Sequence, residues 1–294
     1  MLRFVARGLP LALAVSTLYV PAGVAVQRQS NNTLALLDMV ATERAFAARA
    51  RVVGWKQAFL DYFADDAIGF DSDQSGPAKD QIRSQPDPPK ELQLLWEPRY
   101  GDIAATGDLG YLTGPSTSIN PARNNGMPRH SNYASVWKRQ ADGSFKVVMD
   151  VGIPTPGPVT FPQGFTRAFR DGAFAASGGP ATDTPSLRKA DDELTKDALR
   201  SQVDAYRTRL APGARLHRGA TMPLVGDDAI VTWLRSQPAY TQGEVRYAEA
   251  ARSGDLGYTW GRYALPAEKG FYVRAWSRAG DGAWKVALDV LQPQ

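Results

Sequence analysis

Hydrophobic residues recur at the spacing of helical turns over residues 34–46, and the same spacing returns over residues 55–63. This pattern predicts two consecutive helices that are interrupted at Gly54. In the second half of the chain, residues 198–210 match the second of these helices, whereas residues 187–194 leave room for only a short first helix.

Downstream of each helical region, hydrophobic and polar residues alternate, as they do along residues 284–290. Gly-Asp pairs at 107–108 and 254–255 are turn signals ahead of strands. Asp-Gly pairs at 142–143 and 281–282 lie between alternating runs and predict hairpin turns. Helices followed by an antiparallel meander predict an α+β unit whose helices cover one face of a curved sheet.

The chain repeats itself once. Residues 97–111 and 244–258 are identical at nine of fifteen positions, and residues 136–151 are echoed at 275–290. Equivalent positions therefore include Trp137 and Trp276, both expected to be buried in their sheets. Solenoid repeats are much shorter, at about 20–47 residues, so the repeat indicates a duplicated domain.

The predicted organisation is a first domain at 31–151, a linker at 152–186 and a second domain at 187–294. The linker holds six Gly and six Pro. It also holds four phenylalanines, which either dock on one domain or stay exposed in a free linker: Phe161, Phe165, Phe169 and Phe174.

The N-terminus has the pattern of a secretory signal peptide. Arg3 and Arg7 precede an apolar run at 9–20, and Gly23 and Ala25 follow at the spacing that signal peptidase reads. We expect residues 1–25 to be removed by cleavage after Ala25, and the protein to be periplasmic or extracellular. A membrane anchor is the alternative, but the run is shorter than the roughly 20 residues that a spanning helix needs.

Composition excludes several classes of protein. Hydrophobic residues make up 43% of the chain, which is too many for a mainly disordered protein. With no cysteine and only His130 and His217, the chain offers no typical metal centre, and nothing points to a cofactor. Removing Arg3 and Arg7 lowers the net charge from +4 to +2, and neither half carries the basic stripe that nucleic acid requires.

Three segments, at 63–67, 253–258 and 284–290, resemble the nuclear transport factor 2-like superfamily. The chain is most similar to its secreted SnoaL-like, ketosteroid-isomerase-like members of unknown function, over residues 33–151 and 187–291. The resemblance implies two tandem cone-shaped domains. It does not define the chemistry, because the superfamily holds isomerases, dehydratases, cyclases and binding modules on one scaffold.

The same resemblance makes Asp71 a candidate proton-shuttling acid, although residues 33–52 lack the tyrosine that ketosteroid isomerases place on their first helix. The alternative for Asp71 is a capping or solvated role. His217 and Arg218 fall on the strand that borders the cavity in this fold. His217 is a candidate base or hydrogen-bond donor, or simply bonds to a neighbour. Trp260 and Tyr263 either line a hydrophobic cavity or pack in the core.

Asp150 and Asp289 occupy matching places on the last strands, and either the fold or the function explains them. The leading hypothesis is a secreted tandem module that binds a small apolar molecule or partner without catalysis. The alternative is an isomerase or lyase that uses a pocket Asp or His. We expect the two domains to pair within one monomeric chain, and pocket chemistry to be confined to one domain at a time. Arg218 suggests an anionic or carbonyl ligand for the second domain, and Asp71 a neutral or cationic one for the first.

Overall fold

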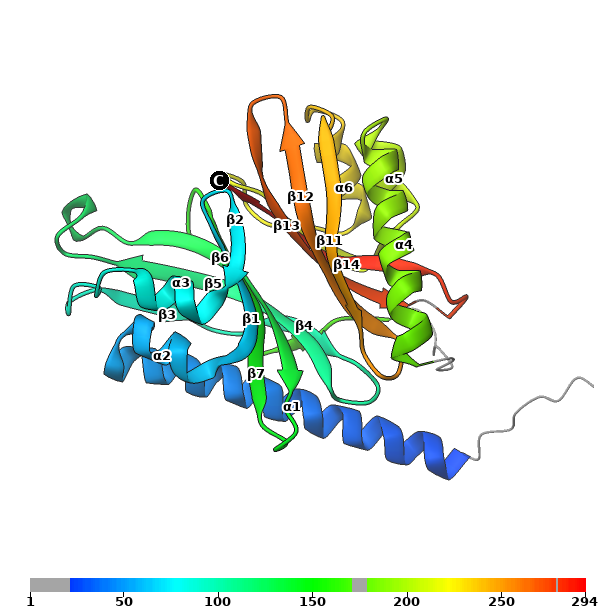
Figure 1. Cartoon of the computed structure of the whole chain (residues 1–294), viewed down its shortest axis with the longest axis horizontal. Helices are drawn as coiled ribbons and strands as arrows, with labels where there is room; N and C mark the ends of the chain where they lie inside the picture. Colours follow the sequence, from blue (N-terminus) through cyan, green and yellow to red (C-terminus); the bar gives the residue numbers. More distant parts are fainter. Residues whose placement is uncertain (1–21, 171–178, 279) are drawn as a thin grey trace, which may run out of the picture.

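The computed structural model describes residues 22–170, 179–278 and 280–294 (Figure 1). Most of the expected signal segment, residues 1–21, lies outside the described residues, as does Phe174. Among the helices that the structure describes, none is long and apolar enough to span a membrane.

Two helices open the first unit, α1 (Ala22–Val53) and α2 (Trp55–Tyr62). The chain turns between them at Gly54, whose φ of 82° lies in the left-handed region that favours glycine. The prediction of two helices interrupted at Gly54 is confirmed. α1 starts upstream of the predicted helix and runs through Ala25, the expected cleavage site.

The first sheet has the strand order β2-β1-β7-β6-β5-β4-β8, and β3 also pairs with β5. A short helix, α3 (Ala78–Ser84), follows the β1–β2 hairpin. The strands are β1 (Phe63–Asp71), β2 (Gln74–Pro77), β3 (Gln93–Trp96), β4 (Tyr100–Ile103), β5 (Leu109–Ile119), β6 (Arg129–Arg139), β7 (Phe145–Pro154) and β8 (Thr166–Arg167).

The second unit has the sheet order β10-β9-β14-β13-β12-β11. Its elements are α4 (Pro180–Ala198), α5 (Gln202–Arg207), α6 (Asp227–Leu234), β9 (Leu210–His217), β10 (Leu224–Val225), β11 (Gln242–Ala250), β12 (Leu256–Leu265), β13 (Glu268–Arg278) and β14 (Trp284–Pro293). α4 is longer than the short helix predicted at 187–194, and it begins within the segment expected to be a linker. Pro180 suits its first turn, where a missing N–H costs nothing.

The two sheets share one register. Ser135 lies opposite Asp150 in the β6–β7 pair, and Arg274 lies opposite Asp289 in the β13–β14 pair. Both pairs contain an irregularity at the same place, next to Trp137 and next to Trp276. Residues at the same register position in the two units are called equivalent below. The predicted α+β class, with helices on one face of each antiparallel meander, is confirmed.

The sheets pack face to face, with the helices of each unit on the outer sides (Figure 1). Residues of both units, including Tyr258 and Val273 of the second, belong to one buried cluster. Near one end of this interface Phe70 stacks on Phe271, with ring centroids 4.3 Å apart, and meets Trp260 edge-on. We call these three residues the aromatic pole.

The equivalents of the aromatic pole are His217, Asn132 and Thr113, which meet in the same way across the interface. Asn132 Nδ2 donates to Thr113 Oγ1 at 2.9 Å and lies 3.0 Å from His217 Nε2. We call this set the polar pole. Equivalent positions therefore meet at both poles of the interface, but the side chains are aromatic at one pole and polar at the other.

The turns before β5 and β12 also meet reciprocally. The Ala105 N–H donates to Asp255 Oδ2 at 3.0 Å, and the N–H of Arg252, its equivalent, donates to Asp108 Oδ2 at 3.1 Å. Thr106 Oγ1 and Ser253 Oγ lie 3.0 Å apart between them. Such an exchange of equivalent contacts is the arrangement found at a twofold interface.

The segment between the units is held against them. β8 pairs with β4, and Arg170 forms ion pairs with both Asp102 of the first unit and Asp255 of the second. Phe161 and Phe165 pack against the core, whereas Phe169 is 68% exposed. Two of the four linker phenylalanines are therefore docked.

We expect the full chain to be a monomer in solution, because each sheet already covers the face through which the other would pair. Size-exclusion chromatography with light scattering at micromolar concentration tests this. A stable dimer would contradict it.

Candidate functional site

A partly open cavity of about 140 Å³ lies between the helices and the sheet of the first unit. Aromatic and aliphatic side chains form one wall, and the strands supply small or polar residues on the other. The lining residues are Phe46, Phe59, Leu94, Trp96, Ser116, Ser131, Tyr133, Asp150 and Gly152.

Asp150 on β7 is the acid of this cavity. Its carboxyl group has no hydrogen bond or ion pair with any residue that the structure describes. Burial raises the pKa of Asp150 well above its usual range, and the nearby Glu43 raises it further. The raised pKa favours the protonated carboxyl group, which can donate as well as accept a hydrogen bond.

Tyr133 on β6 lies diagonally across the sheet from Asp150, since Ser135 is the direct partner of Asp150. The Tyr133 hydroxyl is buried and has no hydrogen-bond partner among the described residues. Burial raises the pKa of Tyr133 far above its usual value, so the hydroxyl keeps its proton. The cavity thus holds two polar groups that are available to a ligand.

Glu43 on α1 forms the polar floor behind the cavity wall. Its carboxylate accepts hydrogen bonds from Trp96 Nε1 at 2.6 Å, Ser135 Oγ at 2.8 Å and Trp137 Nε1 at 2.8 Å. Burial raises the pKa of Glu43, and these three donors oppose the rise. Both carboxylate oxygens are engaged, so Glu43 holds the wall in place and does not face a ligand.

The equivalent space in the second unit is filled. Arg274 stands where the first unit has Ser135, and it forms buried ion pairs with Asp191 and with Asp289, the latter at 2.6 Å. Tyr206 also donates to Asp289 at 2.6 Å. Burial by itself would raise the pKa of Asp289, but Arg218 and Arg274 hold it at about 2.

Two further differences between equivalent residues also help to fill this space in the second unit. Tyr263 stands at the register position of Ser116, and Leu291 at that of Gly152. Both replacements are larger, and both side chains are buried in the second core. The acids Asp150 and Asp289 are therefore equivalent in the fold but opposite in state: one faces a cavity and the other is fully paired.

The structure does not bring the predicted site residues together. Asp71 is exposed at the end of β1, beside the β1–β2 turn, where Ser72 Oγ donates to it at 3.3 Å. His217 is buried in the polar pole, and burial lowers its pKa to about 3. Arg218 is buried 2.8 Å from Asp289 and could reach a ligand only by leaving that partner.

The two predicted cavity aromatics also lie apart from each other. Trp260 belongs to the aromatic pole between the units. Tyr263 lies inside the second unit and donates to Glu268 at 2.6 Å. None of the five predicted residues lines the cavity of the first unit.

Sequence reasoning missed Glu43 and Tyr133, and it left Asp150 between a structural and a functional role. The signal that could have identified Asp150 is the residue opposite it in the sheet. The first unit has Ser135 at this position and the second has Arg274, so of the two acids only Asp150 lacks a cation opposite it. Within the described residues, no three His, Cys, Asp or Glu side chains are grouped so as to hold a metal ion.

Comparisons with known proteins concern single units. No family model matches the chain, and no curated protein does. Nuclear transport factor 2 from Cryptosporidium parvum is 14% identical with a TM-score of 0.33, over 42% of this chain and 100% of that one. A nuclear transport factor 2-like protein of unknown function from Pseudomonas putida is 15% identical with a TM-score of 0.33, over 38% of this chain and 87% of that one.

A cystatin-like fold protein from Burkholderia xenovorans is 14% identical with a TM-score of 0.31, over 38% of this chain and 91% of that one. The names of the first two belong to the superfamily that the sequence motifs resemble. Each match spans about two fifths of this chain, so the tandem arrangement rests on the internal repeat and on the shared register of the two sheets.

Proposed function

We propose that the first unit binds a small, mainly apolar molecule that carries a hydrogen-bond acceptor such as a carbonyl oxygen, and that the second unit serves as its scaffold. The observation that carries the proposal is the Asp150 carboxyl group, which faces an aromatic cavity without a partner. Asp150 is half-buried, so a ligand that supplies a hydrogen-bond partner there replaces water and gains about 1 kcal/mol from the bond.

The size and chemistry of the cavity restrict the ligand. A dry cavity of about 150 Å³ accommodates benzene, so a ring of similar size fits here. Protonated Asp150 and the Tyr133 hydroxyl can each donate a hydrogen bond to a ligand in this cavity, as a neutral carboxylic acid does in other apolar sites. An uncharged ligand is favoured, because no described lining residue carries a positive charge and the raised pKa of Asp150 favours its neutral form.

Binding without catalysis fits this geometry better than an isomerase or lyase. A proton-transfer enzyme needs a group that accepts a proton near neutral pH. The raised pKa of Asp150 favours its protonated form, and both oxygens of Glu43 are occupied by donors from Trp96, Ser135 and Trp137. Mass analysis of recovered ligands for isomerised or dehydrated product tests the alternative.

Binding of cyclohexanone, a ring with one carbonyl group, should depend on pH through Asp150. The folded-state pKa of Asp150 is raised, so the donating form persists to higher pH than in an ordinary aspartate and is lost as the pH rises through that raised value. We expect the affinity measured by calorimetry to be constant at low pH and to fall once Asp150 ionises.

Three variants separate the donor from the charge. Asp150→Asn keeps a donor and should bind at all pH values, whereas Asp150→Leu should abolish binding. Tyr133→Phe should weaken binding by about 1 kcal/mol, or roughly fivefold, through the loss of one hydrogen bond. Ser277→Ala, in the second unit, is the control. Equal affinity of wild type and Asp150→Leu would refute the proposal.

We also propose that the protein is exported to the periplasm or the medium, on the basis of the N-terminal charge and hydrophobicity pattern. Mass spectrometry of the protein from fractionated cells tests this. Export predicts a chain that begins at Val26, and a full-length chain confined to the cytoplasm would contradict it.

A further inference from the structure

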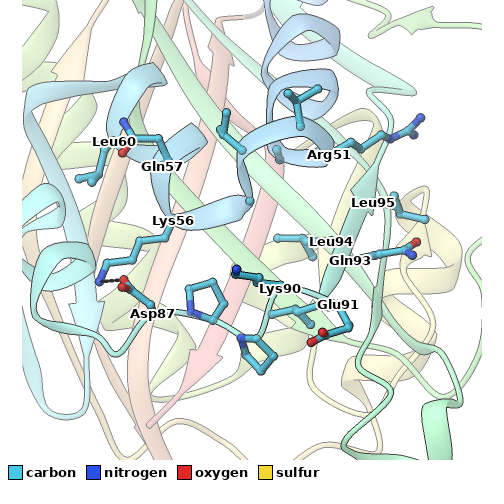
Figure 2. A pocket seen from close by; sticks show the side chains of 17 residues that line it. Arg51, Lys56, Gln57, Leu60, Asp87, Lys90, Glu91, Gln93, Leu94 and Leu95 are labelled. Carbon is cyan, nitrogen blue, oxygen red and sulfur yellow. Dashed lines mark hydrogen bonds and ion pairs between the residues drawn. The ribbon is translucent and has the colours of Figure 1, made fainter.

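A surface groove of about 1000 Å³ lies beside the cavity, between the end of α1, the start of α2 and residues 87–95 (Figure 2). Much of its wall is aliphatic, with half-buried Val53, Leu60, Leu92 and Leu95. Lys56 bridges the two sides of the groove, because its Nζ lies 2.9 Å from Asp87 Oδ1 and donates to the Gln85 carbonyl at 2.5 Å.

The groove and the cavity share a wall residue. Leu94 lines both, and Phe59 of the cavity and Leu60 of the groove are neighbours on α2. Leu94 is half-buried and packs against the first core. An aliphatic side chain is thus the partition between the buried polar groups and a large open surface.

We infer that the ligand of the first unit is an amphiphile, whose acceptor-bearing head occupies the cavity while an unbranched apolar tail passes Leu94 and lies along the groove. The inference rests on the proposed function for the position of the head. The two volumes carry it, because the cavity fits only a small ring, whereas the adjoining groove is several times larger.

The charges along the groove are compatible with an uncharged tail. Lys56 and Asp87 neutralise each other. The other charged lining residues are Arg51, Lys90 and Glu91, which carry both signs, so the groove has no excess of one charge to select a charged tail. A tail in the groove can therefore pack on Val53, Leu60, Leu92 and Leu95 without facing a charge of one sign.

Binding of a series of 4-alkylcyclohexanones to the full-length protein tests the position of the tail. Cyclohexanone alone reports the head, and the ethyl, butyl and hexyl derivatives extend from the opposite side of the ring. We expect the dissociation constant measured by calorimetry to fall about two- to fourfold for each added methylene that leaves water.

Two groove variants, Leu60→Asp and Leu95→Asp, should remove most of this gain and leave the affinity for cyclohexanone itself unchanged. Cyclohexanone binding is also the check that each variant is folded. Leu199→Asp, the same type of change on the second unit, should alter neither the affinity for cyclohexanone nor the gain in affinity with tail length.

The outcomes distinguish the two proposals. Affinity that is independent of chain length, together with loss of cyclohexanone binding in Asp150→Leu, overturns the tail and leaves the cavity site standing. Cyclohexanone binding that survives Asp150→Leu overturns the cavity site instead. A gain with chain length that persists in both groove variants places the tail elsewhere and also overturns the inference.

Discussion

Replacing Arg274 with alanine should lower the free energy of unfolding by about 3–5 kcal/mol, because it leaves the buried Asp191 carboxylate without its cation and removes one of the two cations that face Asp289. Arg274 is 2% exposed and pairs with Asp191 and Asp289, neither of which reaches solvent. The Arg218 guanidinium still faces Asp289, so the uncompensated charge should fall mainly on Asp191. Urea denaturation at neutral pH measures the loss.

The pH dependence of this variant identifies the cause. The folded-state pKa of Asp289 is depressed to about 2, so its contribution to stability is present above the unfolded pKa and is lost as the pH falls towards 2. Wild type should therefore lose stability on acidification more steeply than Arg274→Ala. Arg83→Ala, which breaks an exposed pair with Asp80, should cost less than about 0.5 kcal/mol. If Arg274→Ala behaved like Arg83→Ala, the ion pairs would not be the stabilising contacts.

Trp137→Ala should also cost about 3–5 kcal/mol, and Trp276→Ala should fall in the same range. Both indoles are 0% exposed, so either change leaves a cavity in a core. Trp137 Nε1 donates to the Glu43 carboxylate, whereas Trp276 Nε1 donates to the Thr259 hydroxyl at 2.9 Å. Because a buried acid loses a donor only in the first case, Trp137→Ala should be the more damaging of the two.

Guanidinium melts of both variants, compared with wild type, give these values. Trp233→Ala, which removes a half-buried indole from α6, is the control and should cost less. A loss below about 1 kcal/mol for Trp137→Ala would contradict its burial.

Local pattern was sufficient for the fold because each element is set by neighbours in the chain. The spacing around Gly54, the Asp-Gly turns and the alternation along β14 are each visible within about ten residues. α4 was underestimated because its first turns, near Thr184 and Pro185, carry few apolar residues. These turns are fixed partly by a polar contact with a distant residue, because the Thr184 hydroxyl accepts from the Ala250 N–H at 3.0 Å, 66 residues away.

The site could not be derived in the same way, because it depends on which equivalent residues are small. Asp150 and Asp289 look alike in sequence, and only their partners across the sheet, Ser135 and Arg274, decide which one is free. His217 was misleading for a related reason. His217 lies on β9, the strand on which the resemblance suggested a cavity-facing residue. Its ring instead contacts Asn132 of the other unit, 85 residues away.

The two unlike poles of the interface have a consequence for how the units choose partners. Two copies of the first unit would set Phe70 against Asn132 at both ends, and two copies of the second would set His217 against Phe271. Each self-pairing buries a polar amide or imidazole against a phenyl ring, whereas the natural pairing matches ring with ring and polar group with polar group. In the tandem chain each unit therefore always has the partner whose poles complement its own, at a fixed ratio of one to one.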